Sequence, residues 1–155
     1  MPRASMTDQY IVFILDTQRY ALHLTVVDRV VRMVHVTPLP HAPDVVLGVV
    51  NLEGQVIPVM NVRQRFNLPV REIALTDRLI FAHTARRSVA LVADTVTEVA
   101  EWSAESLIPA EEILPEVKYL EGVIKFRDGL ILIHDLDKFL SLEEEHSLDL
   151  ALDSA

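Results

Sequence analysis

The sequence lacks several residue types, and each absence excludes a class of protein. There is no cysteine among its 155 residues, which excludes a disulfide framework and thiolate metal sites and fits a reducing compartment. Four glycines are too few for a glycine-rich phosphate-binding loop. No apolar run approaches the roughly 20 residues of a membrane-spanning helix. Aromatic residues make up 6% of the chain, so valine, isoleucine and leucine must build the core.

Positive charge is also scarce. The formal net charge is −9, and residues 141–155 hold five acids and no lysine or arginine. Nucleic acids and anionic membrane surfaces bind clustered basic residues, so neither is an expected partner. Direct membrane insertion is not expected either. The first nine residues contain no apolar segment in front of a cleavage site, so we expect no secretion signal and a cytoplasmic protein.

Short apolar stretches separated by turn residues dominate the rest of the chain. Residues 10–15 and 20–24 flank a turn-like tetrapeptide and predict a hairpin. The same pattern predicts further hairpins at 48–60, 78–93 and 119–134. Additional strands are predicted at 26–36 and 94–102, and a short helix at 61–68. Residues 1–9 are predicted to be disordered and residues 142–155 to form an acidic tail or helix.

These elements recur with a period of about 70 residues. Gly48-Val49-Val50 corresponds to Gly122-Val123-Ile124, and Val59-Met60 corresponds to Ile133-His134. Strands joined by tight turns without a crossover helix cannot form a parallel sheet, but they can close into a small barrel. We therefore predict an all-β fold with short helices. It consists of two five-stranded β-barrels, about 10–68 and 77–140, packed on a shared hydrophobic seam, with exchange of strands between the barrels left open.

Residues that carry catalytic chemistry are sparse. His134 and Asp135 are adjacent, but a hydrolytic metal site needs further ligands at defined spacing. No serine or threonine lies in a nucleophile elbow. We therefore expect no enzyme, no metal and no cofactor. A small ligand- or metal-binding barrel that uses His134 and Asp135 remains a remote alternative.

The motifs together resemble the CheW-like family of chemotaxis adaptors over residues 10–141. The most specific matching stretch runs from Val46 to Arg63 and contains Asn51, Gly54, Val56, Ile57, Pro58 and Val59. Supporting matches are Tyr20-Ala21-Leu22, Val27-Asp28, Val30-Val31, Pro38-Leu39-Pro40, Leu91-Val92, Asp94, Tyr119 and Gly122-Val123. The resemblance implies two barrels without catalytic activity. It also implies two partners: the cytoplasmic hairpin tip of a chemoreceptor and the regulatory domain of the chemotaxis histidine kinase.

The resemblance also implies where these partners bind. The receptor tip is expected in a groove between the barrels, with an apolar floor and a polar rim. We expect Val27, Val30 and Val56 on the floor, although ordinary core packing explains these valines equally well. Rim positions are expected at Asp28, Arg29, Asn51 and Glu53, and Gly54 belongs to the same partner-binding set. The protein is then expected at receptor arrays on the inner membrane face.

Glu53 departs from the family pattern, because the tip there is Asn-x-Arg-Gly. Replacing arginine by glutamate changes the local charge by two units and removes five donors. Two explanations are open: the partner carries a compensating basic group, or the tip is solvated and the apolar seam carries binding. An alternative function keeps the fold but makes the chain a coupling or inhibitory protein of another sensory kinase. The acidic tail is interpreted as a capping helix or as a docking segment.

Overall fold

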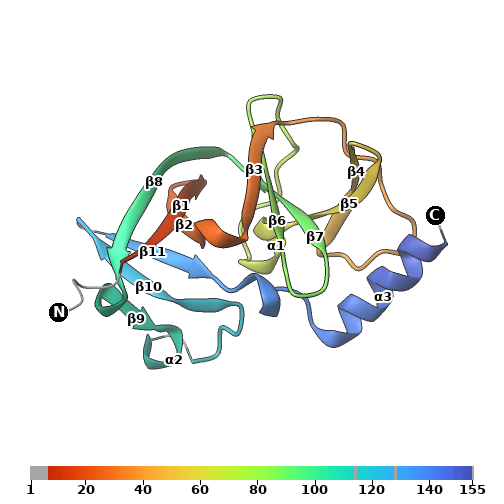
Figure 1. Cartoon of the computed structure of the whole chain (residues 1–155). Helices are drawn as coiled ribbons and strands as arrows, with labels where there is room; N and C mark the ends of the chain where they lie inside the picture. Colours follow the sequence, from red (N-terminus) through yellow and green to blue (C-terminus); the bar gives the residue numbers. More distant parts are fainter. Residues whose placement is uncertain (1–6, 114, 128, 155) are drawn as a thin grey trace.

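The computed structural model describes residues 7–113, 115–127 and 129–154. Two β-sheets lie side by side, and a C-terminal helix packs beside the smaller one (Figure 1). The larger sheet has six strands in the order β8-β1-β2-β11-β10-β9, and the other has five in the order β3-β6-β7-β5-β4. This confirms the predicted all-β fold with short helices, although one sheet has one strand more than predicted.

The elements have the following bounds. The larger sheet consists of β1 (Thr7–Leu15), β2 (Gln18–His23), β8 (Thr95–Ser103), β9 (Leu107–Pro109), β10 (Leu120–Phe126) and β11 (Gly129–His134). The smaller sheet consists of β3 (Val27–Arg32), β4 (Val46–Leu52), β5 (Gln55–Met60), β6 (Arg78–His83) and β7 (Ser88–Ala93). The helices are α1 (Val62–Arg65), α2 (Ala110–Ile113) and α3 (Leu142–Asp153), with 3-10 turns η1 (Leu24–Val26), η2 (Ala104–Ser106) and η3 (Leu136–Lys138).

Both sheets contain strands from both halves of the repeat. Strand β2 runs parallel to β11, with Tyr20 opposite Leu132, and β7 runs parallel to β5, with Ala90 opposite Val59. The first hairpin of each half therefore completes the sheet of the other half. The ranges 10–68 and 77–140 do not coincide with the two sheets, because an internal repeat does not indicate which copy of a strand its neighbour pairs with. This exchange ties the two sheets into one folding unit.

The additional strand β9 lies between residues 102 and 119, where no strand was predicted. Its Ile108 pairs with Val123 of β10, and in the other half Thr37 forms the matching bridge to Val49 of β4. A glycine makes each approach possible. A Cβ at Gly122 would lie 2.4 Å from the Ile108 carbonyl oxygen, and a Cβ at Gly48 would lie 2.3 Å from that of Thr37. The two glycines of the repeat thus have the same structural role.

Three apolar clusters form the interior. One fills the smaller barrel and includes Met33, Val50, Ile57, Leu79 and Phe81. Another fills the larger barrel and includes Tyr10, Val12, Ile124, Ile131 and Ile133. The third, here called the seam core, joins the two sheets. It combines Phe13, Leu15, Tyr20 and Leu22 with Met60, Ile80, Val89 and Leu91, and it extends to Leu148 and Ala151 of α3.

The chain ends differ in how they join this fold. Residues 1–6 lie outside the described part, and Thr7–Gln9, which were expected in a disordered lead, belong to β1 because they pair with Glu101, Trp102 and Ser103 of β8. The acidic tail forms α3 from Leu142 to Asp153. Among the described residues, no helix is long and apolar enough to span a membrane.

Candidate interaction surface

The hairpin tip between β4 and β5 has a two-residue turn. Glu53 (φ 52°) and Gly54 (φ 86°) both have positive φ, as the hairpin turn that matches strand twist requires. The Asn51 side-chain oxygen accepts a hydrogen bond from the Gly54 amide at 2.9 Å. Asn51 and Gly54 therefore shape the turn, and the Glu53 side chain is exposed at its tip.

Glu53 has a partner within the chain. The Arg29 guanidinium lies 3.4 Å from the Glu53 carboxylate, and both side chains are exposed. Arg29 is on β3 and Glu53 directly follows β4, and these two strands are the edges of the smaller sheet. The ion pair therefore spans the two edges where the barrel closes. Both residues were expected on the rim, but their contact with each other was not predicted from the sequence.

Asp28 owes its position to a β-bulge. The pairing of β3 with β6 skips from Val27 to Arg29, so Asp28 is the additional residue, as a bulge requires. Its carboxylate lies 3.0 Å from Nδ1 of His83. Asp28, Arg29 and Glu53 thus form a polar, exposed rim along the closure of the smaller barrel.

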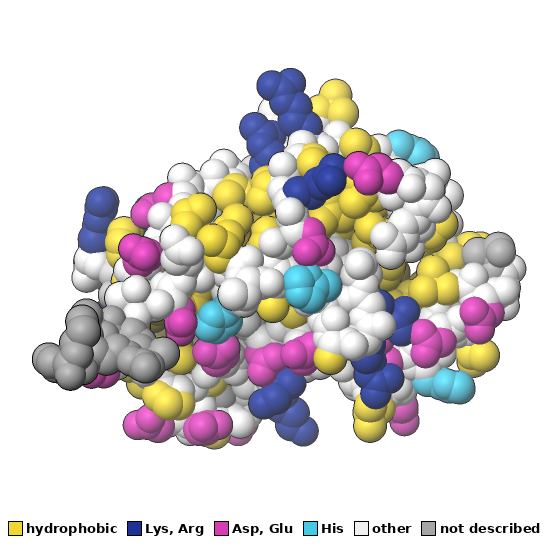
Figure 2. Space-filling model, viewed as in Figure 1, with side chains coloured by type: hydrophobic (Ala, Val, Ile, Leu, Met, Phe, Trp, Pro, Cys, Tyr) yellow, Lys and Arg dark blue, Asp and Glu magenta, His cyan; other side chains and the backbone are white. Residues whose placement is uncertain are grey.

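The three valines expected on a groove floor differ in exposure. Val27 and Val30 are half-buried and pack against the seam core. Val56 lies opposite Asn51 and is 54% exposed. Val99 of β8 is exposed to a similar extent. Figure 2 shows hydrophobic side chains gathered over β8 and β3, in the region between the two sheets. The apolar surface is therefore continuous with the seam core rather than separate from it.

His134 does not form a site. Its ring lies among those of Tyr20, Phe66 and Phe139, with a centroid distance of 4.7 Å to Phe66. Burial lowers the pKa of His134 to about 3, so the imidazole is neutral. The Asp135 carboxylate lies 3.8 Å from the Lys138 ammonium, and neither ring nitrogen of His134 has a hydrogen-bond partner among the described residues. Among the described residues, no group of three potential ligands could hold a metal ion.

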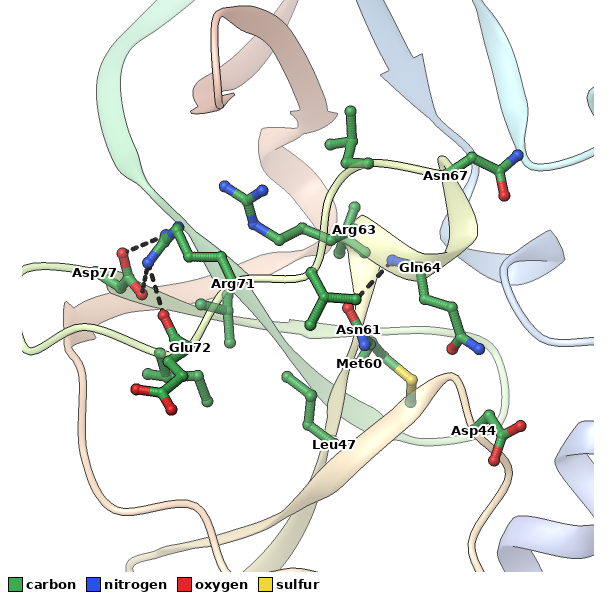
Figure 3. A pocket seen from close by; sticks show the side chains of 15 residues that line it. Asp44, Leu47, Met60, Asn61, Arg63, Gln64, Asn67, Arg71, Glu72 and Asp77 are labelled. Atoms are coloured by element: carbon green, nitrogen blue, oxygen red, sulfur yellow. Dashed lines mark hydrogen bonds and ion pairs between the residues drawn. The ribbon is translucent and has the colours of Figure 1, made fainter.

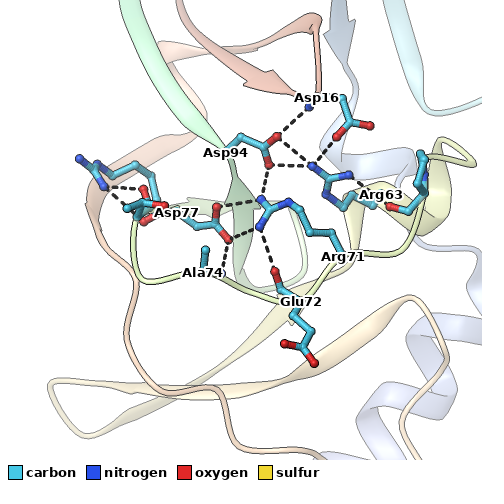
Figure 4. Close-up of polar contacts among 10 residues, drawn as sticks. Asp16, Arg63, Arg71, Glu72, Ala74, Asp77 and Asp94 are labelled. Atoms are coloured by element: carbon cyan, nitrogen blue, oxygen red, sulfur yellow. Dashed lines mark hydrogen bonds and ion pairs between the residues drawn. The ribbon is translucent and has the colours of Figure 1, made fainter.

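A polar network that the sequence analysis did not identify joins the two sheets (Figure 4). The Arg63 guanidinium of α1 lies 2.8 Å from the carboxylates of both Asp16, in the β1–β2 turn, and Asp94, between β7 and β8. Arg71 lies 2.5 Å from Asp94 and 2.8 Å from Asp77. The only sequence signal for this network was that Arg63 and Asp94 both fall in the family pattern.

Next to this network lies a cavity of about 410 Å³, lined by α1, the 67–73 segment and strand residues such as Leu47 and Met60 (Figure 3). Arg63 and Arg71 line it, but their charges are already matched by Asp16, Asp94 and Asp77. Because the charges of these two arginines are matched within the chain, they do not indicate an anionic ligand in the cavity.

In sequence and in fold, this chain is similar to known chemotaxis proteins. The chemotaxis protein CheW of Rhizobium meliloti is 27% identical over 141 residues, which cover 90% of this chain and 91% of that protein. CheW of Bacillus subtilis is 28% identical over 142 residues, with the same shares covered. The crystal structure of the scaffolding protein TtCheW from Thermoanaerobacter tengcongensis superposes with a TM-score of 0.81 at 28% identity, over 90% of this chain and 96% of that one.

The family model described as CheW-like domain matches residues 9–144. This range contains both sheets, apart from Thr7 and Asp8 of β1, and the first turn of α3. It also contains the Arg29–Glu53 rim and the Arg63 network. The chain belongs to the family of CheW-like domains.

Proposed function

We propose that this protein is a non-catalytic adaptor of chemotaxis. It couples the cytoplasmic hairpin tips of chemoreceptors to the regulatory domain of a chemotaxis histidine kinase through protein–protein contacts. The observation that carries the proposal is the match of the whole two-sheet unit to a scaffolding protein, TtCheW, together with relatives named as chemotaxis proteins. The location that follows is cytoplasmic, at receptor arrays on the inner membrane face.

The proposed contact surface follows the closure of the smaller barrel. Val27 and Val30 offer an apolar strip that continues the seam core. Asn51 and Gly54 hold the β4–β5 tip in its turn, while Asp28, Arg29 and Glu53 supply polar groups around it. Val56 adds exposed apolar area on β5. An apolar floor with a charged rim is what an amphipathic helix or a related barrel needs for specific docking.

Within this surface we propose that Glu53 acts as a specificity contact. The tip carries a carboxylate where the family pattern has a guanidinium, and Arg29 supplies a guanidinium from β3, at the other edge of the smaller sheet. An exposed ion pair contributes little to folding stability, so a role in recognition explains it better than a role in stability. A partner adapted to this chain then presents a basic group toward Glu53.

Calorimetric titration with the cognate kinase regulatory domain and with the receptor cytoplasmic fragment tests both proposals. Micromolar binding of both supports the adaptor function. We expect Glu53→Arg to weaken binding to the partner that contacts the tip roughly 5- to 10-fold, and the difference to shrink at high salt. The double change Arg29→Glu with Glu53→Arg keeps the internal pair but reverses its charges, so it separates loss of the pair from loss of complementarity.

If the double variant binds as weakly as Glu53→Arg, the affinity of the partner depends on the charge at position 53, and Glu53 is a specificity contact. If it binds like the natural protein, the internal pair is what matters and Glu53 is not a specificity contact. Binding to neither partner by the folded natural protein would contradict the adaptor proposal. Binding to the kinase alone would favour the alternative, a coupling or inhibitory protein, which the chemotaxis names of the relatives do not favour.

A further inference from the structure

Two arginines face each other at the end of the strand that carries the proposed apolar floor. Strands β3 and β6 are antiparallel, and Arg32 is directly opposite Arg78. Two residues earlier Val30 is opposite Ile80, and both pack in or against the seam core. Because side chains two residues apart share a face of a strand, Arg32 and Arg78 extend the face that carries Val30.

This arginine pair has no acidic counterpart in the part of the chain that the structure describes. Arg78 donates hydrogen bonds to the carbonyl oxygens of Thr76 at 2.9 Å and Asp77 at 3.4 Å, and no carboxylate of a described residue forms an ion pair with Arg32 or Arg78. By contrast, a carboxylate pairs with each of Arg29, Arg63, Arg65, Arg71 and Arg87. Like charges directly opposite in a ladder destabilise it. Of the arginines that form no ion pair with a described residue, Arg32 and Arg78 are the two that lie directly opposite each other, in a chain of net charge −9.

Exposed apolar side chains flank the arginine pair. Val34 follows β3 and is 49% exposed, and Leu75 precedes β6 and is 89% exposed. A hydrogen bond of 3.3 Å from the Met33 amide to the Asp77 carbonyl holds the two flanking segments together. Figure 2 shows Lys and Arg side chains gathered at the top of the view, where β3 ends, next to the hydrophobic region over β3 and β8.

We propose that Arg32 and Arg78 bind a carboxylate of the receptor hairpin tip and select receptors that carry an acid at this place. The inference rests on the proposed adaptor function and names the chemistry of the partner. The two residues from Val30 to Arg32 span about 6.6 Å of strand, which is close to the 5.4 Å pitch of an α-helix. A helix that lies along β3 therefore places an Asp or Glu over the arginines when an apolar residue one turn away covers Val30.

Titration of the soluble receptor cytoplasmic fragment into four variants tests the assignment. The variants are Arg32→Gln, Arg78→Gln, the double change, and the control Arg86→Gln in the exposed β6–β7 turn. We expect each single change to weaken receptor binding about 5- to 30-fold, because a charge-assisted hydrogen bond is lost. The control and the affinity for the kinase regulatory domain should not change. Each single change should raise the thermal midpoint by about 1–2 °C, because repulsion between the arginines is removed.

A charge-reversal experiment identifies the partner residue. Each Asp and Glu of the receptor tip is changed to Lys and titrated against Arg32→Glu, and recovery of affinity for one receptor variant supports the pairing. Unchanged receptor affinity in the double Arg→Gln variant overturns the arginine assignment and leaves the adaptor function standing. Failure of the natural protein to bind either receptor or kinase overturns both. Sedimentation could instead detect a dimer that the Arg→Gln changes dissociate. That result would show that the arginines contact a second copy of this chain, and it would also overturn the assignment to the receptor.

Discussion

At the scale of the residue, His134 is in the environment least suited to its chemistry. It is almost fully buried, and both ring nitrogens lack a hydrogen-bond partner in the described part of the chain. The position is apolar in the other half of the repeat, where Met60 occupies it. A neutral imidazole among aromatic rings fills volume but leaves two polar atoms unpaired, which costs stability. His134 is therefore a core residue with an uncompensated polar group.

The histidine makes stability depend on pH in a defined direction. Burial lowers the pKa of His134 to about 3, while an unfolded histidine has a pKa of about 6.5. Between these values only the unfolded chain binds the proton, so the unfolding free energy falls as pH falls, by up to about 1.4 kcal/mol per pH unit. Urea unfolding between pH 7 and 4.5 should show this slope in the natural protein and in exposed His35→Gln, and lack it in His134→Met. Equal slopes in all three would contradict the assignment.

At the scale of the element, α3 behaves as part of the fold. Ser141 and Glu144 form a capping box at its start, and Leu148 and Ala151 are buried in the seam core. The Arg87 guanidinium, in the β6–β7 turn, pairs with Glu145 at 3.0 Å and also with Asp149. Arg65 pairs with Glu144 at 2.6 Å. Most of the acids that the sequence analysis placed in a charged tail are therefore matched by arginines of the smaller sheet and α1.

Two leucines of α3 provide a matched test. Leu148 is fully buried, whereas Leu150 is 56% exposed. Leu148→Ala should lower the unfolding free energy by about 2–4 kcal/mol, because it leaves a cavity in the seam core, and Leu150→Ala by less than about 0.5 kcal/mol. Urea unfolding followed by circular dichroism measures both. A small effect of Leu148→Ala combined with weakened partner binding would instead identify α3 as a docking segment.

In each half of the repeat, a strand approaches a neighbouring segment closely at a glycine, Gly48 or Gly122. A Cβ at Gly122 would overlap the backbone of β9, because the Ile108 carbonyl oxygen would lie at 2.4 Å. In contrast, a Cβ at Gly129 would meet no atom closer than 3.9 Å. Gly122→Ala should therefore cost about 2 kcal/mol or more through forced displacement of the backbone, while Gly129→Ala should change stability by less than about 1 kcal/mol. Comparable midpoints of thermal unfolding for the two variants would refute this role of Gly122.

At the scale of the whole molecule, the sequence predicted which segments form strands better than which strands pair with each other. Alternating apolar stretches and turn residues indicated the hairpins, and the repeat indicated two similar barrels. Which hairpin completes which barrel was left open, because the parallel contacts of β2 with β11 and of β5 with β7 join strands far apart in sequence. The site followed the same rule. Arg29 and Glu53 were identified singly, but their contact depends on barrel closure, and the Arg63 network depends on four segments that meet only in the fold.

The Arg63 network connects the two sheets through ion pairs. Burial raises the pKa of Asp94, but hydrogen bonds from Arg63 and Arg71 outweigh burial and lower that pKa overall. The Asp94 carboxylate also accepts a hydrogen bond from the Asp16 amide at 2.7 Å. The β1–β2 turn of the larger sheet is thus tied to α1 and to the β7–β8 junction (Figure 4). Because the proposed groove lies between the sheets, we expect this connection to limit changes in its width.

Removing the central cation of the network should therefore affect stability and binding together. The Arg63 and Asp94 side chains are largely buried, so Arg63→Met leaves a carboxylate with too few partners and should lower the unfolding free energy by about 2–4 kcal/mol. The exposed pair gives the control, since Arg29→Met should cost less than about 1 kcal/mol.

Because the Asp94 pKa is lowered in the fold, its contribution to stability is present at neutral pH and lost as pH falls through that pKa. The unfolding free energies of the natural protein and of Arg63→Met should therefore converge in acid. Spin labels on β3 and β8 should report a broader distance distribution in Arg63→Met. An unchanged distribution would show that the seam core alone orients the sheets.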